Sequence, residues 1–281
     1  MSWRFAVSTL GAPGAPLRDT AHLAAAHGCE GLEIRVHPSE EVHVGMPAAQ
    51  AARAREQVAD AGLEIACLAG YTKVCGPGPV VDELRALLDL AVLLDAPAIR
   101  VFPGGHHPGS DHPGSDHTDG DGQALDHIAT ILPDLRATGV RLLIETHDSH
   151  PTGEAASRLA QPLASPNHVA VLWDAVHPWR AGEPPATTRA ALGEYLAYFQ
   201  LKDVATNAHT PVLPGDGDVP LAECAQLLAN WSGWVSLEWE RAWYPTIPPL
   251  PIPLRAAADW YTHWQPPTES QPPSPQLNAP T

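Results

Sequence analysis

Eight short, apolar, strand-like segments alternate strictly with stretches of helical periodicity, and this alternation constrains the fold more than any other feature of the chain. Strict alternation indicates a parallel sheet covered by helices. Eight such units within residues 1–264 predict a closed (β/α)₈ barrel in a single α/β domain. The strand-like segments are residues 4–9, 31–36, 63–69, 98–103, 140–146, 169–175, 198–203 and 234–239.

The stretches between these segments are rich in Ala and Leu and predict helices. Three of them end in Gly just before the next strand, at Gly28, Gly62 and Gly139, which is typical of a helix C-terminus. An open, doubly wound sheet is the alternative, but the glycine-rich turn expected after its first strand is missing. The predicted helices are residues 16–28, 47–62, 80–96, 124–139, 153–163, 186–196, 220–231 and 253–264.

Two segments fall outside this rhythm. Residues 104–122 are a low-complexity stretch of Gly, His and Asp with a near-repeat of HPGSD, and they predict a loop after the fourth strand. His and Asp in this loop can bind stray metal, but we favour a mobile loop. Residues 265–281 are rich in Pro, Ser and Gln and predict a disordered tail.

Composition narrows the function classes. The formal net charge of −16 lacks the basic footprint that nucleic-acid binders need, so we expect no nucleic-acid partner. No apolar run approaches the length of a membrane span, and the first residues do not resemble a signal peptide. The four cysteines are scattered along the sequence, without the paired spacing of a zinc site, and we expect them to be reduced thiols. We therefore expect a cytoplasmic protein without a membrane partner.

Four polar residues lie near the ends of four successive strand-like segments: Glu145, Asp174, Gln200 and Glu238. In a barrel of this kind the C-terminal strand ends form the active site. Side chains alternate between the two faces of a strand, so these residues face the same way as the residues two positions before them, Leu143, Leu172, Tyr198 and Ser236. If those residues face the barrel interior, the four polar side chains ring its mouth. Three carboxylates without cationic partners repel one another, and a divalent metal is the natural solution. The competing interpretation is that each acid caps a following helix.

The chain resembles the xylose isomerase-like TIM barrels, the sugar-phosphate isomerase and epimerase group. The resemblance covers about residues 3–264 and rests on the order and spacing of several individually weak motifs. These motifs are GLEIR (31–35), IETH (144–147), WDAVHP (173–178), FQLKD (199–203), PGDGDVPL (214–221) and SLEWE (236–240).

The resemblance implies a single divalent metal ion held by Glu145, Asp174 and Glu238, with Glu240 a weaker match for the last position. The family pattern has His at the third position, where this chain has Gln200. An amide oxygen suits Mg²⁺ or Mn²⁺ better than Zn²⁺ or Co²⁺, although these stay alternatives. In the epimerase branch the two metal-bound glutamates move the proton, which assigns acid and base roles to Glu145 and Glu238.

Further residues near the strand ends are candidate substrate contacts. His177 follows Asp174 with the spacing that places a substrate-contacting His in the epimerase branch. The remaining candidates share parity with strand positions that face the mouth, and Glu33 can alternatively pair with Arg35 inside the barrel. The full set is His147, His177, Arg35, Glu33, Lys202 and Glu240.

The predicted function is a divalent-metal-dependent isomerase or epimerase that acts through an enediolate on a sugar, a sugar phosphate or a polyol-derived ketone. A dehydratase on the same metal site is an alternative within the enzyme class. A non-catalytic or weakly metal-binding barrel is the alternative that Gln200 supports. An apurinic endonuclease is disfavoured, because several expected His ligands are missing. Relatives often pair, so the resemblance allows a homodimer.

Overall fold

The computed structural model describes residues 2–104 and 118–266. Eight parallel strands close into a barrel in the order β1-β10-β7-β6-β5-β4-β3-β2. Strand β1 pairs with both β2 and β10, so the predicted barrel is confirmed and the open sheet is excluded. The barrel strands are β1 (Trp3–Ser8), β2 (Gly31–Arg35), β3 (Glu64–Lys73), β4 (Ala98–Phe102), β5 (Arg141–Glu145), β6 (Val169–Asp174), β7 (Leu196–Leu201) and β10 (Gly233–Leu237).

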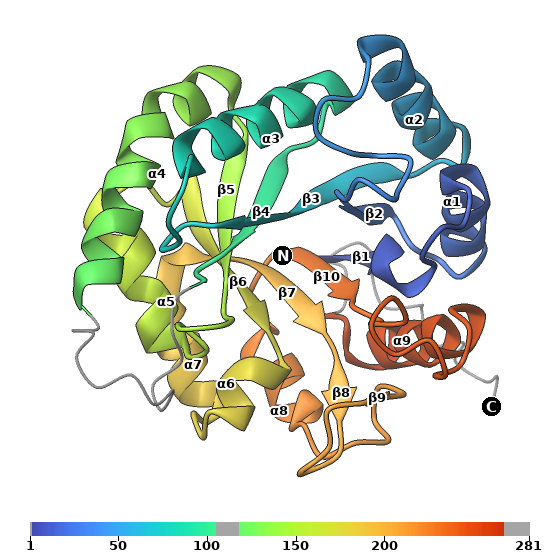
Figure 1. Cartoon of the computed structure of the whole chain (residues 1–281). Coiled ribbons are helices and arrows are strands. Elements are labelled where there is room, and N and C mark those ends of the chain that lie inside the picture. Colours follow the sequence, from blue (N-terminus) through green and yellow to red (C-terminus); the bar gives the residue numbers. More distant parts are fainter. Residues whose placement is uncertain (1, 105–117, 267–281) are drawn as a thin grey trace, which may run out of the picture.

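Helices surround the barrel on its outer face (Figure 1). Gly62 and Gly139 follow the C-terminal ends of helices α2 and α4 with φ of 76° and 74°, which confirms the helix ends expected at these glycines. Helix α5 begins where the Thr152 hydroxyl accepts a hydrogen bond from the Ala155 N–H. The helices are α1 (Leu17–Ala26), α2 (Ala48–Asp60), α3 (Val80–Leu94), α4 (Thr118–Thr138), α5 (Gly153–Ala160), α6 (Val176–Arg180), α7 (Pro185–Leu192), α8 (Leu221–Leu227) and α9 (Pro251–Trp264).

The barrel interior is filled by alternate side chains of the strands. Leu143, Leu172 and Tyr198 belong to one buried inner cluster, so the inward parity assigned from the sequence is confirmed. Four alanines, from β1, β3, β4 and β6, and Cys67 of β3 complete this cluster, and their small size leaves room for the larger side chains. Because side chains alternate along a strand, the residues two positions further on also face inward, at the C-terminal end of the barrel.

The structure departs from the predicted elements in several places. Helix α4 begins at Thr118, so the end of the segment predicted as a loop over 104–122 is helical. The physical reason is tertiary, because the Asp121 carboxylate in the first turn binds His150 and Arg158. Residues 105–117, the rest of that loop apart from Gly104, and 267–281, most of the predicted tail, lie outside the described residues.

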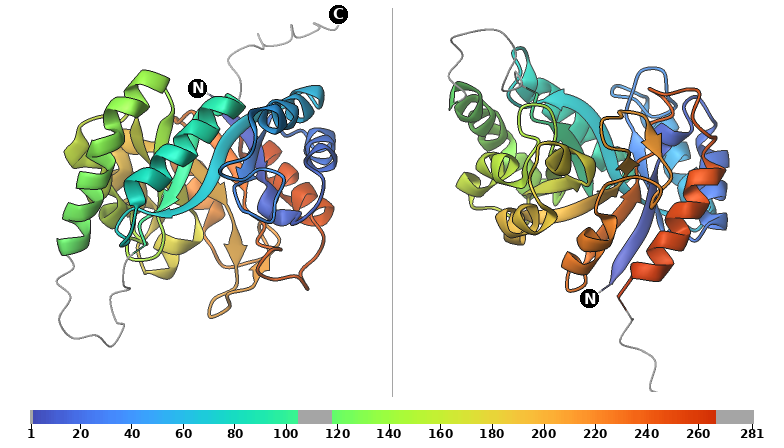
Figure 2. Two further views of the ribbon diagram at one scale, coloured as in Figure 1. Left: turned by 45° about the horizontal axis from the view of Figure 1, so that its top comes forward. Right: turned by 90° about the horizontal axis from the view of Figure 1, so that it is seen from below.

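Other elements were absent from the prediction. Strand β3 runs four residues beyond its predicted end, to Lys73. Helix α6 and the antiparallel ribbon of β8 (Asp203–Val204) and β9 (Pro211–Val212) follow β6 and β7 directly, at the C-terminal end of the barrel (Figure 2). The described residues include no helix long and apolar enough to cross a membrane. The four cysteines are free thiols, as the sequence indicated.

The buried Asp203 carboxylate organises the loop after the ribbon. It accepts hydrogen bonds from four backbone N–H groups, those of Val204 (2.9 Å), Gly215 (2.8 Å), Gly217 (3.1 Å) and Val219 (3.2 Å). A Cβ atom at Gly217 would collide with the same carboxylate, which explains the glycine there. The PGDGD motif is therefore architectural.

Replacing Asp203 with Ala is expected to destabilise the fold by roughly 3 kcal/mol, because several buried N–H donors lose their acceptor. Asp216→Ala is the matched control in the same loop, since the Asp216 side chain is exposed and accepts no hydrogen bond from the described residues. Urea denaturation measures both variants. Equal stability of the two variants would show that the Asp203 contacts do not hold the loop.

Candidate active site at the barrel mouth

An open pocket of about 260 Å³ lies at the C-terminal end of the barrel. Its acidic lining comes from Glu145 at the end of β5, from Asp148 in the loop that follows, and from Glu238 and Glu240 after β10. Tyr71, Phe102 and Trp243 supply aromatic walls, with Tyr71 packed edge-on against both of the others. The pocket thus brings together residues from strands that are far apart in the sequence.

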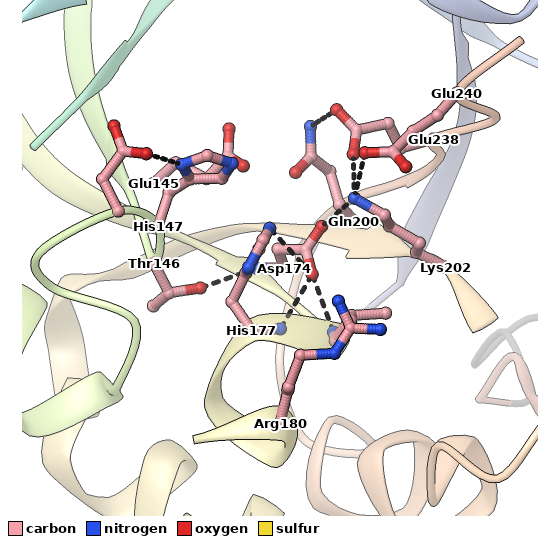
Figure 3. Close-up of polar contacts among 12 residues, drawn as sticks. Glu145, Thr146, His147, Asp174, His177, Arg180, Gln200, Lys202, Glu238 and Glu240 are labelled. Atoms are coloured by element: carbon pink, nitrogen blue, oxygen red, sulfur yellow. Dashed lines mark hydrogen bonds and ion pairs between the residues drawn. The ribbon is translucent and has the colours of Figure 1, made fainter. Parts of the chain in front are cut away.

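All four strand-end residues predicted as ligands lie buried at this end of the barrel (Figure 3). Glu145 and Glu238 line the pocket, whereas Asp174 and Gln200 are fully buried. One oxygen of Asp174 accepts hydrogen bonds from the N–H groups of Val176 (2.7 Å) and His177 (3.2 Å). The helix-cap interpretation is therefore correct for one oxygen of Asp174, while its other oxygen faces the site.

The carboxylates have cationic partners, which corrects the sequence argument that they lack them. The Arg100 guanidinium enters from β4, and its Nε lies 3.0 Å from Oε2 of Glu145. The Lys202 ammonium lies 2.9 Å from Glu238 Oε2, 2.6 Å from Glu240 Oε1 and 3.4 Å from Asp174 Oδ2 (Figure 3). Two cations inside the barrel reduce the repulsion that the sequence argument assigned to a metal.

Gln200 contacts the acids through its amide nitrogen. Nε2 donates to Glu33 Oε1 at 3.0 Å and to Glu238 Oε1 at 3.3 Å. The amide oxygen Oε1 is buried and has no hydrogen-bond partner. Gln200 therefore links two acids that belong to opposite ends of the chain and keeps one oxygen available.

A second group of ligand atoms lies beside Glu145. Glu145, His147 and His177 each place one ligand atom within 4.8 Å of the others. The two imidazole rings lie edge to face, with centroids 4.3 Å apart. This group offers the imidazole nitrogens that position 200 lacks.

Burial sets the protonation of these groups. It raises the pKa of Glu145 to about 8, although Arg100 and His147 oppose the shift. Burial and the nearby Lys202 ammonium hold the pKa of His177 well below its ordinary value, so its ring is neutral at pH 7. Burial works against the ammonium of Lys202, but Asp174, Glu238 and Glu240 outweigh it and raise the pKa of Lys202 well above its ordinary value.

Four of the six predicted substrate contacts divide into two groups, while His177 lies against the His147 ring. His147 and Glu240 line the pocket, whereas Glu33 and Lys202 are buried and bind other side chains. Glu33 and Arg35 do not pair with each other, which corrects one of the two interpretations offered for them. Arg35 instead forms an ion pair with Glu40 (2.6 Å) and donates from Nε to the Tyr71 hydroxyl (2.8 Å).

Sequence reasoning missed several residues of the site. Arg100 sits inside an apolar strand, and a charged residue in such a run is itself a signal for a buried partner. Thr146 follows Glu145, and its hydroxyl accepts the Asp174 N–H at 3.0 Å. Lys73, Tyr71 and Phe102 line the pocket, and only the longer β3 brings the first two to the mouth.

The residues present fit a divalent cation. Native proteins leave few buried polar atoms unpaired. Here Gln200 Oε1, Glu145 Oε2 and His177 Nε2 are all buried without a hydrogen-bond partner, although Arg100 lies close enough to Glu145 for an ion pair. Carboxylate and amide oxygens are ligands for hard cations, and neutral imidazole suits Zn²⁺ or Mn²⁺.

Comparisons with known proteins agree with this architecture. The family profile described as "Xylose isomerase-like TIM barrel" matches residues 21–263. No curated protein has a significant sequence match to this chain. Several solved structures share the fold, all at low sequence identity.

Three of these structures illustrate the range of proteins with this fold. An IOLI protein "with a binding zinc atom" aligns with a TM-score of 0.77, 14% identity, and coverage of 93% of this chain and 99% of that chain. A D-psicose 3-epimerase in the presence of D-fructose aligns with a TM-score of 0.74, 16% identity, and coverage of 92% and 98%. The probable 3-DHS dehydratase AsbF from Bacillus anthracis aligns with a TM-score of 0.72, 17% identity, and coverage of 92% and 98%. At such identities the similarity shows the fold alone.

Proposed function

The chain belongs to the xylose isomerase-like TIM barrel family, and we propose that it is a divalent-metal-dependent isomerase or epimerase. Its substrate would be a sugar, a sugar phosphate or a polyol-derived ketone. The observation that carries this proposal is the placement of Glu145 and Glu238. These two glutamates come from different strands and line one pocket, next to buried ligand atoms without hydrogen-bond partners.

Glu145, Asp174, Gln200 and Glu238 would hold the ion, which we propose to be Mn²⁺ or Mg²⁺. When bound, such an ion polarises a substrate carbonyl and so acidifies the neighbouring C–H bond. The orphaned oxygen of Gln200 supports this set. His147 and His177 provide a second set with Glu145, and a variant that replaces both His with Ala distinguishes the two.

Glu145 and Glu238 would exchange protons with the carbon next to the carbonyl. One carboxylate takes the proton and the other returns one, which inverts that carbon or moves the carbonyl. Arg100 positions Glu145 through the ion pair, and the Gln200 amide positions Glu238. The high pKa of Glu145 suits a group that must both take up and release a proton near pH 7.

The pocket restricts the size of the substrate. Drug-sized ligands occupy pockets of about 300–1,000 Å³, whereas this one measures about 260 Å³. The aromatic walls suit the apolar face of a sugar ring. A monosaccharide or a compound of similar size therefore fits the proposal.

Incubation of the Mn²⁺-loaded protein with a panel of ketoses and aldoses in D₂O tests the function. Proton NMR is expected to show deuterium entering at the carbon next to the carbonyl of the true substrate. The product spectrum separates epimerisation from loss of water, which would instead identify a dehydratase. Metal binding without deuterium entry for any of the panel would favour the non-catalytic barrel.

Metal affinity is expected to rise with pH up to about 8. Burial raises the pKa of Glu145 to about 8, so below that pH the folded protein holds a proton that metal binding must release. Calorimetric titration with Mn²⁺ at pH 6, 7 and 8 is expected to show an affinity that rises by at most about tenfold per pH unit. His147→Ala should keep this dependence, and a flat profile in the wild type would contradict it.

A further inference from the structure

Lysine is rare in this chain, and its placement is informative. Of the 16 basic residues only two are lysines, Lys73 and Lys202. Both lie at the C-terminal end of the barrel, since Lys73 ends β3 and Lys202 follows β7. Lysine differs from arginine in carrying a compact point charge on a flexible stem. The chain thus uses this compact cation at the candidate site alone.

Lys202 is embedded among acids. Its side chain is 4% exposed, and its ammonium contacts one oxygen each of Asp174, Glu238 and Glu240. The ammonium has three N–H donors and three carboxylate acceptors, so each donor has one acceptor. By contrast, Lys73 lines the same pocket and forms no ion pair with any described residue.

The contacts of Lys202 engage the remaining free oxygens of two proposed ligands. The other oxygen of Asp174 accepts two backbone N–H groups. The other oxygen of Glu238 accepts from the Gln200 amide. Neither carboxylate can therefore bind a divalent ion through an unengaged oxygen while Lys202 keeps its present position.

We propose that Lys202 is the resident counter-ion of the metal site and must release Asp174 and Glu238 before these acids bind a divalent ion. This inference rests on the proposed metal site. Glu240, which accepts the shortest of the three hydrogen bonds and lies at the pocket, retains Lys202 after its release. Lys202 keeps the acids together in the metal-free protein and lowers the affinity for the metal.

Two matched variants test this role. Lys202→Met removes the competing charge, so its Mn²⁺ affinity in calorimetric titration is expected to rise by roughly tenfold or more, since each factor of ten needs only about 1.4 kcal/mol. Lys73→Met removes the other lysine of the pocket, which forms no ion pair with the proposed metal-binding residues. The Mn²⁺ affinity of this variant is expected to stay within about twofold of that of the wild type. Unchanged or weaker Mn²⁺ binding by Lys202→Met would overturn the proposal.

A measurement on the wild type covers the case in which Lys202→Met does not fold. With ¹⁵N-labelled lysine the protein gives only two side-chain ammonium signals. Saturation with diamagnetic Mg²⁺, monitored by calorimetry, is expected to shift the signal of the buried ammonium strongly and that of Lys73 little. A Lys202 signal that stays fixed at saturation would overturn the proposal.

The outcomes separate this inference from the proposed function. Mn²⁺ binding of equal affinity by the wild type and Lys202→Met contradicts the role of Lys202 and leaves the metal site intact. Binding by Lys202→Met alone supports the role of Lys202 as a competitor. Binding by neither protein contradicts both the metal site and the role of Lys202.

Discussion

Replacing either Glu145 or Glu238 with Gln is expected to lower kcat by about 10³-fold, within the range of general acid–base catalysis. Each amide keeps the shape of the carboxylate but cannot take up a proton. Loss of either partner stops the exchange, because one glutamate removes the proton and the other returns it. The barrel should stay folded, since Gln fills the same buried space.

Deuterium entry and product formation, measured on the substrate found in the screen, quantify the effect. Glu64→Gln is the matched control, because Glu64 begins β3 at the opposite end of the barrel and its side chain is 66% exposed. Its kcat should equal that of the wild type, and circular dichroism should show folded protein for all three variants. Full activity in either Glu145→Gln or Glu238→Gln would contradict the assigned roles.

Replacing Arg100 with Met is expected to destabilise the protein by roughly 3–5 kcal/mol at pH 9, where Glu145 is ionised in the wild type, because removing one partner of a buried ion pair leaves the other charge uncompensated. Arg100 is 3% exposed, pairs with Glu145, donates to the Gly70 carbonyl at 3.0 Å and stacks on the Phe102 ring. Much of the loss comes from the Glu145 carboxylate left in a buried place without its cation.

A double-mutant cycle in urea denaturation isolates that contribution. The combination of Arg100→Met with Glu145→Gln removes both charges and should recover part of the stability lost by Arg100→Met alone. A carboxyl whose folded pKa is raised binds its proton more tightly than in the unfolded chain, so its stability cost grows as pH rises from its unfolded value towards the folded one. Because Arg100 lowers the pKa of Glu145, that pKa lies above about 8 in Arg100→Met, and the two proteins differ in this cost only as pH rises past about 8. The deficit of Arg100→Met should therefore be larger at pH 9 than at pH 7.

The surface ion pair of Arg85 with Asp134 provides the control for this cycle. Both side chains are about half exposed, and their closest atoms are 3.2 Å apart. Arg85→Met is expected to cost less than about 1 kcal/mol, because solvent screens such pairs. Equal losses in the free energy of unfolding for Arg85→Met and Arg100→Met would show that the buried pair of Arg100 with Glu145 stabilises the fold no more than a surface pair.

The sequence predicted the barrel and the four strand ends because both follow from short-range periodicity. Alternation gives the repeating unit, and parity along each strand places Glu145, Asp174, Gln200 and Glu238 at one end. The short elements α6 and β8–β9 carry too few residues to show a period. The extension of β3 to Lys73 was missed because GYTK, its last four residues, lacks the apolar run of the strand core.

The charge balance of the site could not be predicted because it depends on pairing between strands. Arg100 reaches Glu145 across neighbouring strands, and Lys202 reaches two acids that follow it by more than 35 residues. Arg35 pairs with Glu40 in the next loop and does not pair with Glu33 on its own strand. Parity shows which residues face inward, but only the register and the loop paths decide which charges meet.

The central claim is that Glu145 and Glu238 belong to a divalent-metal site at the barrel mouth. Equilibrium dialysis of the purified protein against Mn²⁺, followed by elemental analysis, tests it most directly. The account predicts one ion per wild-type chain and its loss in a variant that carries both Glu145→Gln and Glu238→Gln. An absence of bound ion in the wild type, or one ion that persists in the double variant, would contradict the claim.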